Sequence, residues 1–229
     1  MRLFYTPNIS SDIIWLTEED TKHCLKVLRL KKGDSINVTD GKGNMSDAEI
    51  NDENIRACSI RIISTKQEYN KRNFKLNIAI SPTKNINRYE WFLEKCTEIG
   101  IDEISPIACD HSEKIKINND RSEKIIIAAL KQSCIAYLPK INPLIDLKTM
   151  LSASSIQHPA SSIQYFIAVC GEYEGKKHLK EVYQKNTDAM ILIGPEGDFS
   201  PNEIKFAIEN GFKPVSISKL MIITIYFSI

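Results

Sequence analysis

The sequence lacks paired cysteines, a strong net charge and a long apolar segment, and each absence excludes a class of protein. Its six cysteines include no C-x-x-C pair, so neither a disulfide framework nor a structural zinc site is predicted. The net charge is only +1, so a nucleic-acid-binding surface would have to come from local clusters of basic residues. The N-terminus, MRLFYTPNIS, has no signal-peptide core, and the apolar tail at 220–229 is shorter than the roughly 20 residues that span a bilayer. These features predict a cytoplasmic protein with no metal and no membrane segment.

Two nucleotide-binding signatures are also absent. The segment GEYEGKK at 171–177 follows an apolar run, as a P-loop does, but three residues rather than four separate its glycines. Lys177 also stands where a P-loop needs a hydroxyl that binds magnesium. The turn GPEG at 194–197 lacks the G-x-G-x-x-G pattern of a dinucleotide fold. An unrelated nucleotide-binding α/β protein is therefore disfavoured.

The stretch ILIGPEGDFSPNEIKFAIENGF at 191–212 predicts a buried strand, a tight turn and a helix. Ser200, Pro201 and Glu203 form a capping-box pattern with a proline in the first turn, and Gly211 ends the helix. This unit places backbone N–H groups at the carboxyl end of a strand, where open α/β sheets bind ligands. From the residues alone, both a ligand site and a simple turn are consistent with GPEG.

The periodicity divides the chain into two parts. Residues 1–70 contain short strands and turn signals, which indicate a small barrel or curled sheet, and one helix from about Thr17 to Leu30. After a polar linker at 64–73, strands and helices alternate, which predicts a parallel sheet covered by helices on both faces. The strands are expected at 74–80, 101–108, 141–145, 165–170 and 189–193, and the helices at 87–99, 121–134, 147–151, 177–184 and 201–210.

Basic residues recur at helical spacing on the first expected helix. Lys22, Lys26 and Arg29 lie at i, i+4 and i+7, beside His23. The stripe fits contacts with phosphates, and it fits an ordinary solvent-exposed helix face equally well.

Several motifs together resemble one family of enzymes. LIGPEGDFSPNEI, followed by GFKPVS, resembles the cofactor-loop signature of the RsmE-type 16S ribosomal RNA uridine-N3 methyltransferases, in the SPOUT superfamily. The H…VLR…GD pattern that begins at His23 resembles the family's N-terminal element. Lys84 with EWFLEKCTEIG at 90–100, and Arg121 with ALKQS at 129–133, resemble two further segments. The resemblance extends along nearly the whole chain.

The resemblance implies a fold, a cofactor and partners. It implies a PUA-like RNA-binding β-barrel at 1–70 and a SPOUT α/β methyltransferase domain at 74–229 with a C-terminal trefoil knot. Such a knot is an exception to the rule against threaded chains. The family binds S-adenosylmethionine in a bent conformation in its knot loops and generally forms a homodimer. The expected substrate is 16S rRNA or the small ribosomal subunit.

The resemblance also implies roles for particular residues. N3 of uridine is a weak acid, so methylation requires removal of its proton and stabilisation of the charge on O2 and O4. Lys95 and Glu98 are the candidate pair for this step, although the two residues would also fit an ordinary exposed helix face. Gln132 is the candidate residue for recognition of the base edge. The expected cofactor-binding residues are Ile193, Gly194, Pro195, Glu196, Gly197, Ser216 and Ile217. The expected RNA-binding residues are His23, Lys26, Arg29, Lys32, Lys84, Arg88 and Arg121.

The resemblance stops after Ser216. The family continues with L-G-x-R-I-L-R-T-E-T-A and a terminal helix, whereas this chain reads ISKLMIITIYFSI. A frameshifted or truncated coding sequence would explain the difference. The alternative function is therefore an RNA-binding protein of the same fold that has lost catalysis.

Overall fold

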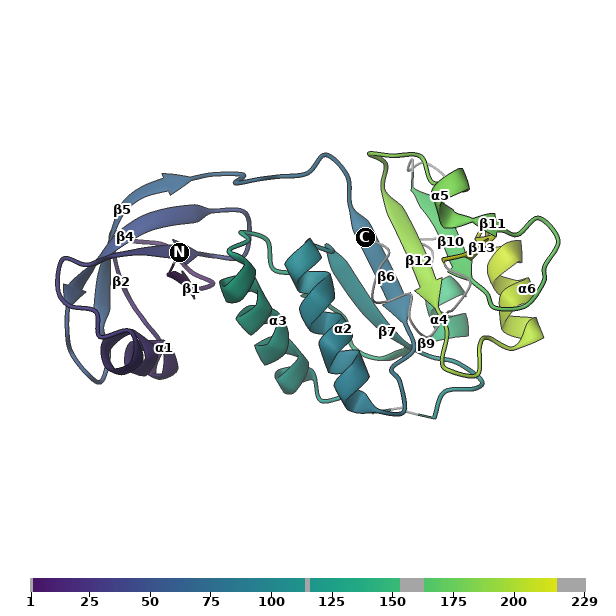
Figure 1. The fold of residues 1–229 in the computed structure, drawn as a ribbon, viewed down its shortest axis with the longest axis horizontal. Helices are drawn as coiled ribbons and strands as arrows, with labels where there is room; N and C mark the ends of the chain where they lie inside the picture. The colour runs from purple at the N-terminus through teal and green to yellow at the C-terminus, as the bar shows by residue number, and fades with distance from the viewer. Residues whose placement is uncertain (1, 114–115, 153–162, 218–229) are drawn as a thin grey trace. The chain divides into compact units, whose positions relative to one another are not determined.

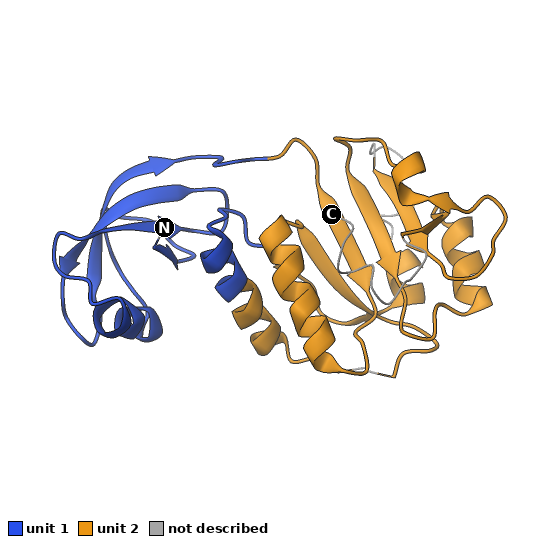
Figure 2. Cartoon of the chain, viewed as in Figure 1, with its two compact units in different colours: residues 1–71, 127–138 blue, residues 72–126, 139–229 orange. Residues whose placement is uncertain are grey.

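The computed structural model describes residues 2–113, 116–152 and 163–217. Contacts divide the chain into two units, which Figure 2 shows in different colours. Unit 1 contains residues 1–71 and 127–138, and unit 2 contains residues 72–126 and 139–229. Residues 127–138 fall within the range 74–229 expected for the second domain, but they pack in unit 1, where Leu130 and Ala136 share a buried cluster with Leu3 and Met45.

Unit 1 is built on a five-stranded sheet in the order β1-β3-β4-β5-β2. The strands are β1 Leu3–Tyr5, β2 Ile13–Trp15, β3 Ser35–Thr39, β4 Met45–Asp52 and β5 Ser59–Lys66. Alternate residues such as Ile36, Val38 and Ile60 are buried on one side of the sheet. The short strands and turns of this unit are as expected from the sequence.

The first helix differs from its prediction. The side chain of Thr17 caps α1 (Glu18–Lys22), but the next residues form a π-helical turn, η1 (His23–Val27). Leu28 N donates to His23 O at 2.9 Å, an i to i+5 bond. Arg29 follows with a φ of 55°, so it lies outside the helix. The stripe predicted from helical spacing therefore does not extend to Arg29.

Unit 2 is built on an eight-stranded parallel sheet in the order β11-β13-β10-β12-β6-β7-β8, with β9 paired to β7 (Figure 1). The strands are β6 Leu76–Ile80, β7 Glu103–Ala108, β8 Lys140–Ile141, β9 Ile145–Asp146, β10 Gln164–Ala168, β11 Lys177–His178, β12 Ala189–Ile193 and β13 Lys213–Ser216. The helices are α2 Ile86–Ile99, α3 Asn119–Ser133, α4 Leu147–Ser152, α5 Leu179–Val182 and α6 Pro201–Glu209. Helix α3 runs from unit 2 into unit 1.

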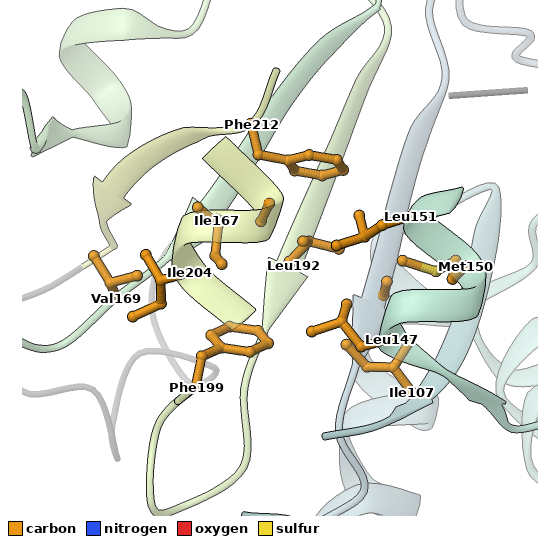
Figure 3. Packing of buried hydrophobic residues seen from close by; sticks show 12 residues of the cluster. Ile107, Leu147, Met150, Leu151, Ile167, Val169, Leu192, Phe199, Ile204 and Phe212 are labelled. Atoms are coloured by element: carbon orange, nitrogen blue, oxygen red, sulfur yellow. The ribbon is translucent and has the colours of Figure 1, made fainter. Parts of the chain in front are cut away.

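Helices cover both faces of this sheet. Figure 3 shows α4 and α6 on one face, where Leu147, Met150 and Ile204 surround Leu192 of β12. The neighbouring residue Ile191 points to the other face and packs with Leu179 and Val182 of α5. The predicted parallel α/β sheet with two helical layers is confirmed.

Two predicted elements are shorter than expected. The strand at 141–145 is split into β8 and β9, with Pro143, which has no N–H to donate, between them. The helix at 177–184 begins as strand β11, which pairs with β13, and His178 Nδ1 then accepts the Lys180 N–H as the cap of α5. The serine-rich loop at 153–162 lies outside the described residues, and so does the tail at 218–229. The expected trefoil knot and the frameshift hypothesis both depend on that tail. Across the described ranges, no helix is long and apolar enough to cross a membrane.

Two isoleucines on α6 test the packing of this helix. Ile204 is 1% exposed and Ile208 is 41% exposed. We expect Ile204→Ala to lower the free energy of unfolding by about 2–5 kcal/mol, because it leaves a cavity between α6 and the sheet. Ile208→Ala, the matched control, is expected to cost less than about 1 kcal/mol, since little area is uncovered. Urea unfolding followed by circular dichroism measures both, and equal losses would contradict this packing.

Candidate functional site

The candidate site lies at the carboxyl edge of the unit 2 sheet, where the loops after β6, β7 and β12 meet. Ser81 N, after β6, donates to Ile193 O at the end of β12 at 2.9 Å. Ser81 Oγ lies 2.8 Å from Ser112 Oγ in the loop after β7. Ligands bind at this edge in open α/β sheets because consecutive loops converge there. The structure therefore places the turn at 194–197 in a suitable position for a ligand.

The turn after β12 has a defined backbone conformation. Asp198 N donates to Pro195 O at 3.0 Å, and Asp198 has a φ of 62°, which is uncommon for a residue other than glycine. The Asp198 carboxylate accepts from Phe199 N at 2.8 Å and from Cys170 N, after β10, at 2.9 Å. Asp198 thus joins the β12 turn to the β10 loop.

Gly194 is required by close packing. A Cβ on this residue would lie 3.0 Å from Phe199 Cδ2 and 3.2 Å from Phe199 N. Phe199 is 3% exposed and belongs to the core, so it has little freedom to move. A Cβ on Gly197 would meet His111 Cβ at 3.4 Å, which is close to an ordinary contact. The backbone is therefore sterically restricted at Gly194 and much less so at Gly197.

Glu203, on α6, connects two loops through a buried carboxylate. It is 1% exposed; its Oε2 accepts from Ser200 N, and its Oε1 accepts from Asp110 N, both at 2.8 Å. Ser200 Oγ donates to Asp110 Oδ2 at 2.6 Å and lowers the pKa of Asp110 below its ordinary value. A lowered pKa means that this contact is kept at neutral pH and is lost as the pH falls through that value. The capping box expected from the sequence is confirmed, and its glutamate also fixes the β7 loop.

The polar side chains of this edge hold the turn in place. Glu196 Oε1 accepts from Lys84 N at 3.1 Å. His111 Nδ1 lies 3.2 Å from Gly197 O and 3.0 Å from Asp198 O. Because both partners are carbonyl oxygens, Nδ1 carries the proton in the neutral ring and Nε2 is the acceptor. Glu196 thus joins the turn to the β6 loop.

The second expected cofactor segment ends on the same edge. β13 and β12 flank β10, with Ala168 of β10 opposite Ile193 on one side and Val215 on the other. Ser216 ends β13, and Ile217 is the last residue described. Two strand spacings correspond to about 10 Å, so Gly194 and Ser216 lie on either side of the β10 loop. The seven expected cofactor residues are therefore at one edge.

The candidate catalytic pair lies elsewhere on unit 2. Lys95 Nζ contacts Glu98 Oε1 at 2.9 Å and Glu94 Oε1 at 2.8 Å, and these hydrogen bonds raise the pKa of Lys95 above its ordinary value. Helix α2 starts at the carboxyl edge and runs back, so Lys95 is about 14 Å along its axis from Ile86. Gln132, on α3, belongs to unit 1. The catalytic roles of these three residues stay predictions.

The expected RNA-binding residues fall in both units. His23, Lys26, Arg29 and Lys32 lie in unit 1 and are exposed. In unit 2, Lys84 Nζ pairs with Glu113 Oε2 at 2.7 Å, and Arg88 lies in the first turn of α2. The Arg121 guanidinium donates to both carboxylate oxygens of Glu90. The bond from Arg121 lowers the pKa of Glu90, so Arg121 is already engaged by a carboxylate.

The residues that position the turn at 194–197 were not predicted from the sequence. Asp110 and His111 directly follow β7, and Asp198 directly follows GPEG. Because ligands bind at the carboxyl ends of strands, these positions could have been chosen as candidates from the sequence. The hydrogen bond between Glu203 and the β7 loop could not be predicted from a local pattern, because Asp110 is distant from Glu203 in the chain.

Both parts of the chain match known protein families. Residues 70–222 match the model of an RNA methyltransferase domain, and residues 16–63 match that of an RNA methyltransferase PUA domain. The chain is 34% identical to Ribosomal RNA small subunit methyltransferase E 2 of Borreliella burgdorferi, over 83% of this chain and 76% of that protein.

Solved structures have the same fold. A probable rRNA-methyltransferase from Porphyromonas gingivalis is 37% identical, with a TM-score of 0.86, over 96% of this chain and 90% of that one. A Ribosomal RNA small subunit methyltransferase E from Neisseria gonorrhoeae, bound to S-adenosyl methionine, is 22% identical, with a TM-score of 0.81 over the same shares.

The Glu203 contact predicts a local effect of substitution. Glu203→Gln replaces one acceptor with a donor, so one of the two buried N–H groups loses its partner at a cost of about 1–3 kcal/mol. We expect amide exchange at Asp110 or Ser200 to accelerate accordingly in hydrogen-exchange measurements. Glu209→Gln on the same helix, where the glutamate side chain is 58% exposed, is the control and is expected to leave exchange unchanged. Unchanged exchange in Glu203→Gln would contradict the role of this carboxylate.

Proposed function

The chain belongs to the RsmE-type family of RNA methyltransferases, and we propose that it methylates N3 of a uridine in 16S ribosomal RNA with S-adenosylmethionine as methyl donor. The observation that carries the proposal is the turn at 194–197, fixed by Asp198, Glu196 and Glu203 at the edge where parallel sheets bind ligands. The name of the Neisseria gonorrhoeae relative supports the choice of cofactor.

The residues at this edge suit S-adenosylmethionine. Gly194 packs on Phe199 and has no room for a side chain, so the glycine lets the turn keep the backbone conformation that the cofactor would contact. Ile193 to Gly197 would hold the cofactor on one side of the β10 loop, and Ser216 with Ile217 on the other. When bound, the cofactor supplies an electrophilic methyl group.

The chain must also remove the N3 proton and offset the charge on the base. We assign this role to Lys95 and Glu98, because a cation and a carboxylate in contact combine both functions. The pair lies about 14 Å along α2 from the carboxyl edge, so the assignment requires a second copy of the chain or the RNA to bring it to the donor. We therefore include a homodimer in the proposal.

The partners follow from the same family. RNA is the substrate class, and we propose 16S rRNA within the small ribosomal subunit as the target, in the cytoplasm. Contacts with the phosphate backbone fix the position of a large RNA. The residues that would make these contacts are His23, Lys26, Arg29, Lys32, Lys84, Arg88 and Arg121.

Methyl transfer and cofactor affinity test the proposal together. The chain is expected to bind S-adenosylmethionine in calorimetry and to transfer a radioactive methyl group to small subunits that lack the modification. Absence of both would overturn the proposal. Retained RNA binding without cofactor binding would favour the alternative, an RNA-binding protein that has lost catalysis.

A matched pair of glycine variants tests the cofactor turn. Gly194→Ala places a Cβ against Phe199, and relief of that contact must distort the turn at a cost of about 1–3 kcal/mol. We expect the affinity for S-adenosylmethionine to fall about 10-fold or more in Gly194→Ala. Gly197→Ala meets only an ordinary contact, so we expect a loss of less than about 3-fold. Equal affinities in the two variants would contradict the assignment of Gly194.

A further inference from the structure

Unit 1 contains a hollow of about 630 Å³ to which no particular ligand has been assigned above. Its walls come from β1, from α1 and η1, and from the last turns of α3, all within unit 1. Its volume lies in the range of about 300–1,000 Å³ that is typical of small-molecule sites. One wall is the π-helical turn, a distortion that is frequent at functional sites.

The charge of the hollow favours an anion. Arg2, Lys22, Lys26 and Lys131 line it, against Glu19 and Asp20. Lys131 Nζ is held by Asp20 Oδ1 at 2.9 Å, and Lys22 pairs with Glu18 on the surface. In the part of the chain that the structure describes, neither Arg2 nor Lys26 has an acidic partner within ion-pair distance. Glu19 has no ion-pair partner there either, so one positive charge is in excess once the pairs are counted, and Arg2 and Lys26 are the two cations available for a phosphate group.

The other lining groups suit a base. His23 is exposed, and its ring packs against the buried ring of Phe4 with centroids 6.3 Å apart, which holds the imidazole in position. Val27, 66% exposed, adds an apolar surface at the rim. Gln132 also lines the hollow and is exposed, and its amide can both donate and accept. An aromatic ring beside an amide is a common way of binding an unstacked RNA base.

We propose that this hollow binds one unstacked nucleotide of the RNA substrate, with its phosphate on Arg2 and Lys26 and its base between His23 and Gln132. The proposal rests on the proposed function for the identity of the RNA. It assigns Gln132 to a recognition site in unit 1 in place of the reaction centre, and it gives His23 a contact with the base in place of a phosphate. A simple phosphate site would need neither the ring nor the amide, so the test must separate the base from the phosphate.

The first experiment locates binding directly. The full chain is titrated with uridine, cytidine, adenosine and guanosine 5′-monophosphates, and with ribose 5-phosphate, while NMR follows the Gln132 side-chain amide and the Val27 methyl groups. At least one nucleotide is expected to shift both signals and to bind about 5-fold or more tightly than ribose 5-phosphate, because stacking and the amide contact add to the phosphate contact. Equal binding of ribose 5-phosphate, or shifts confined to unit 2, would overturn the proposal.

The second experiment uses RNA and a charge-matched control. Lys26→Ala combined with Gln132→Ala is expected to weaken binding of deproteinised 16S rRNA about 10-fold in filter assays, with unchanged affinity for S-adenosylmethionine. Lys66→Ala removes one positive charge from the end of β5, outside the hollow, and is expected to change RNA affinity less than about 2-fold. Equal losses for Lys66→Ala and for the double variant would overturn the proposal. Nucleotide binding in the hollow without either cofactor binding or methyl transfer would overturn the proposed function and leave this inference standing.

Discussion

The buried carboxylate of Glu203 is the contact on which the candidate cofactor site depends. A carboxylate that is 1% exposed is costly unless its oxygens are satisfied, and here backbone N–H groups from two loops satisfy them. The same residue caps α6, so the helix, the turn before it and the loop after β7 form one unit. Cooperative bonds of this kind hold a ligand loop rigid without any ligand.

Packing beneath the turn supports this arrangement. Phe199 follows the turn directly and inserts into the cluster formed by α4, α6 and the sheet (Figure 3). The position of Phe199 makes a side chain at residue 194 unfavourable, so a core residue determines the shape of a surface loop. A side chain at residue 194 would therefore disturb the core and the turn together, whereas one at residue 197 would meet only an ordinary contact.

Unit 1 shows how the second half of α3 acquires a separate role. Leu130 packs with Leu3 and Met45, and Lys131 binds Asp20, so these turns of α3 belong to the N-terminal unit. Gln132 follows them and lines the hollow beside α1 and η1. Helix α3 thus begins in unit 2, which contains the methyltransferase sheet, and its last turns contribute side chains to unit 1, which has the PUA fold.

The sequence by itself determined the features that depend on neighbours along the chain. These include the capping box at Ser200, the left-handed glycine at 211 that ends α6, the buried run of β12 and the alternation that produces a parallel sheet. The motifs from Lys84 to Ser216 were also sufficient to identify the family. Each of these signals is local, because caps, turns and periodicity act over a few residues.

Only the tertiary structure decided which distant residues meet. It joined Glu203 to Asp110 and Asp198 to Cys170, and it placed Gln132 in unit 1 with His23. It also replaced an expected α-helix with a π-helical turn at His23, which put Arg29 outside the basic stripe. Such contacts depend on how strands are ordered and on how a helix packs, and periodicity along the sequence contains no information about either.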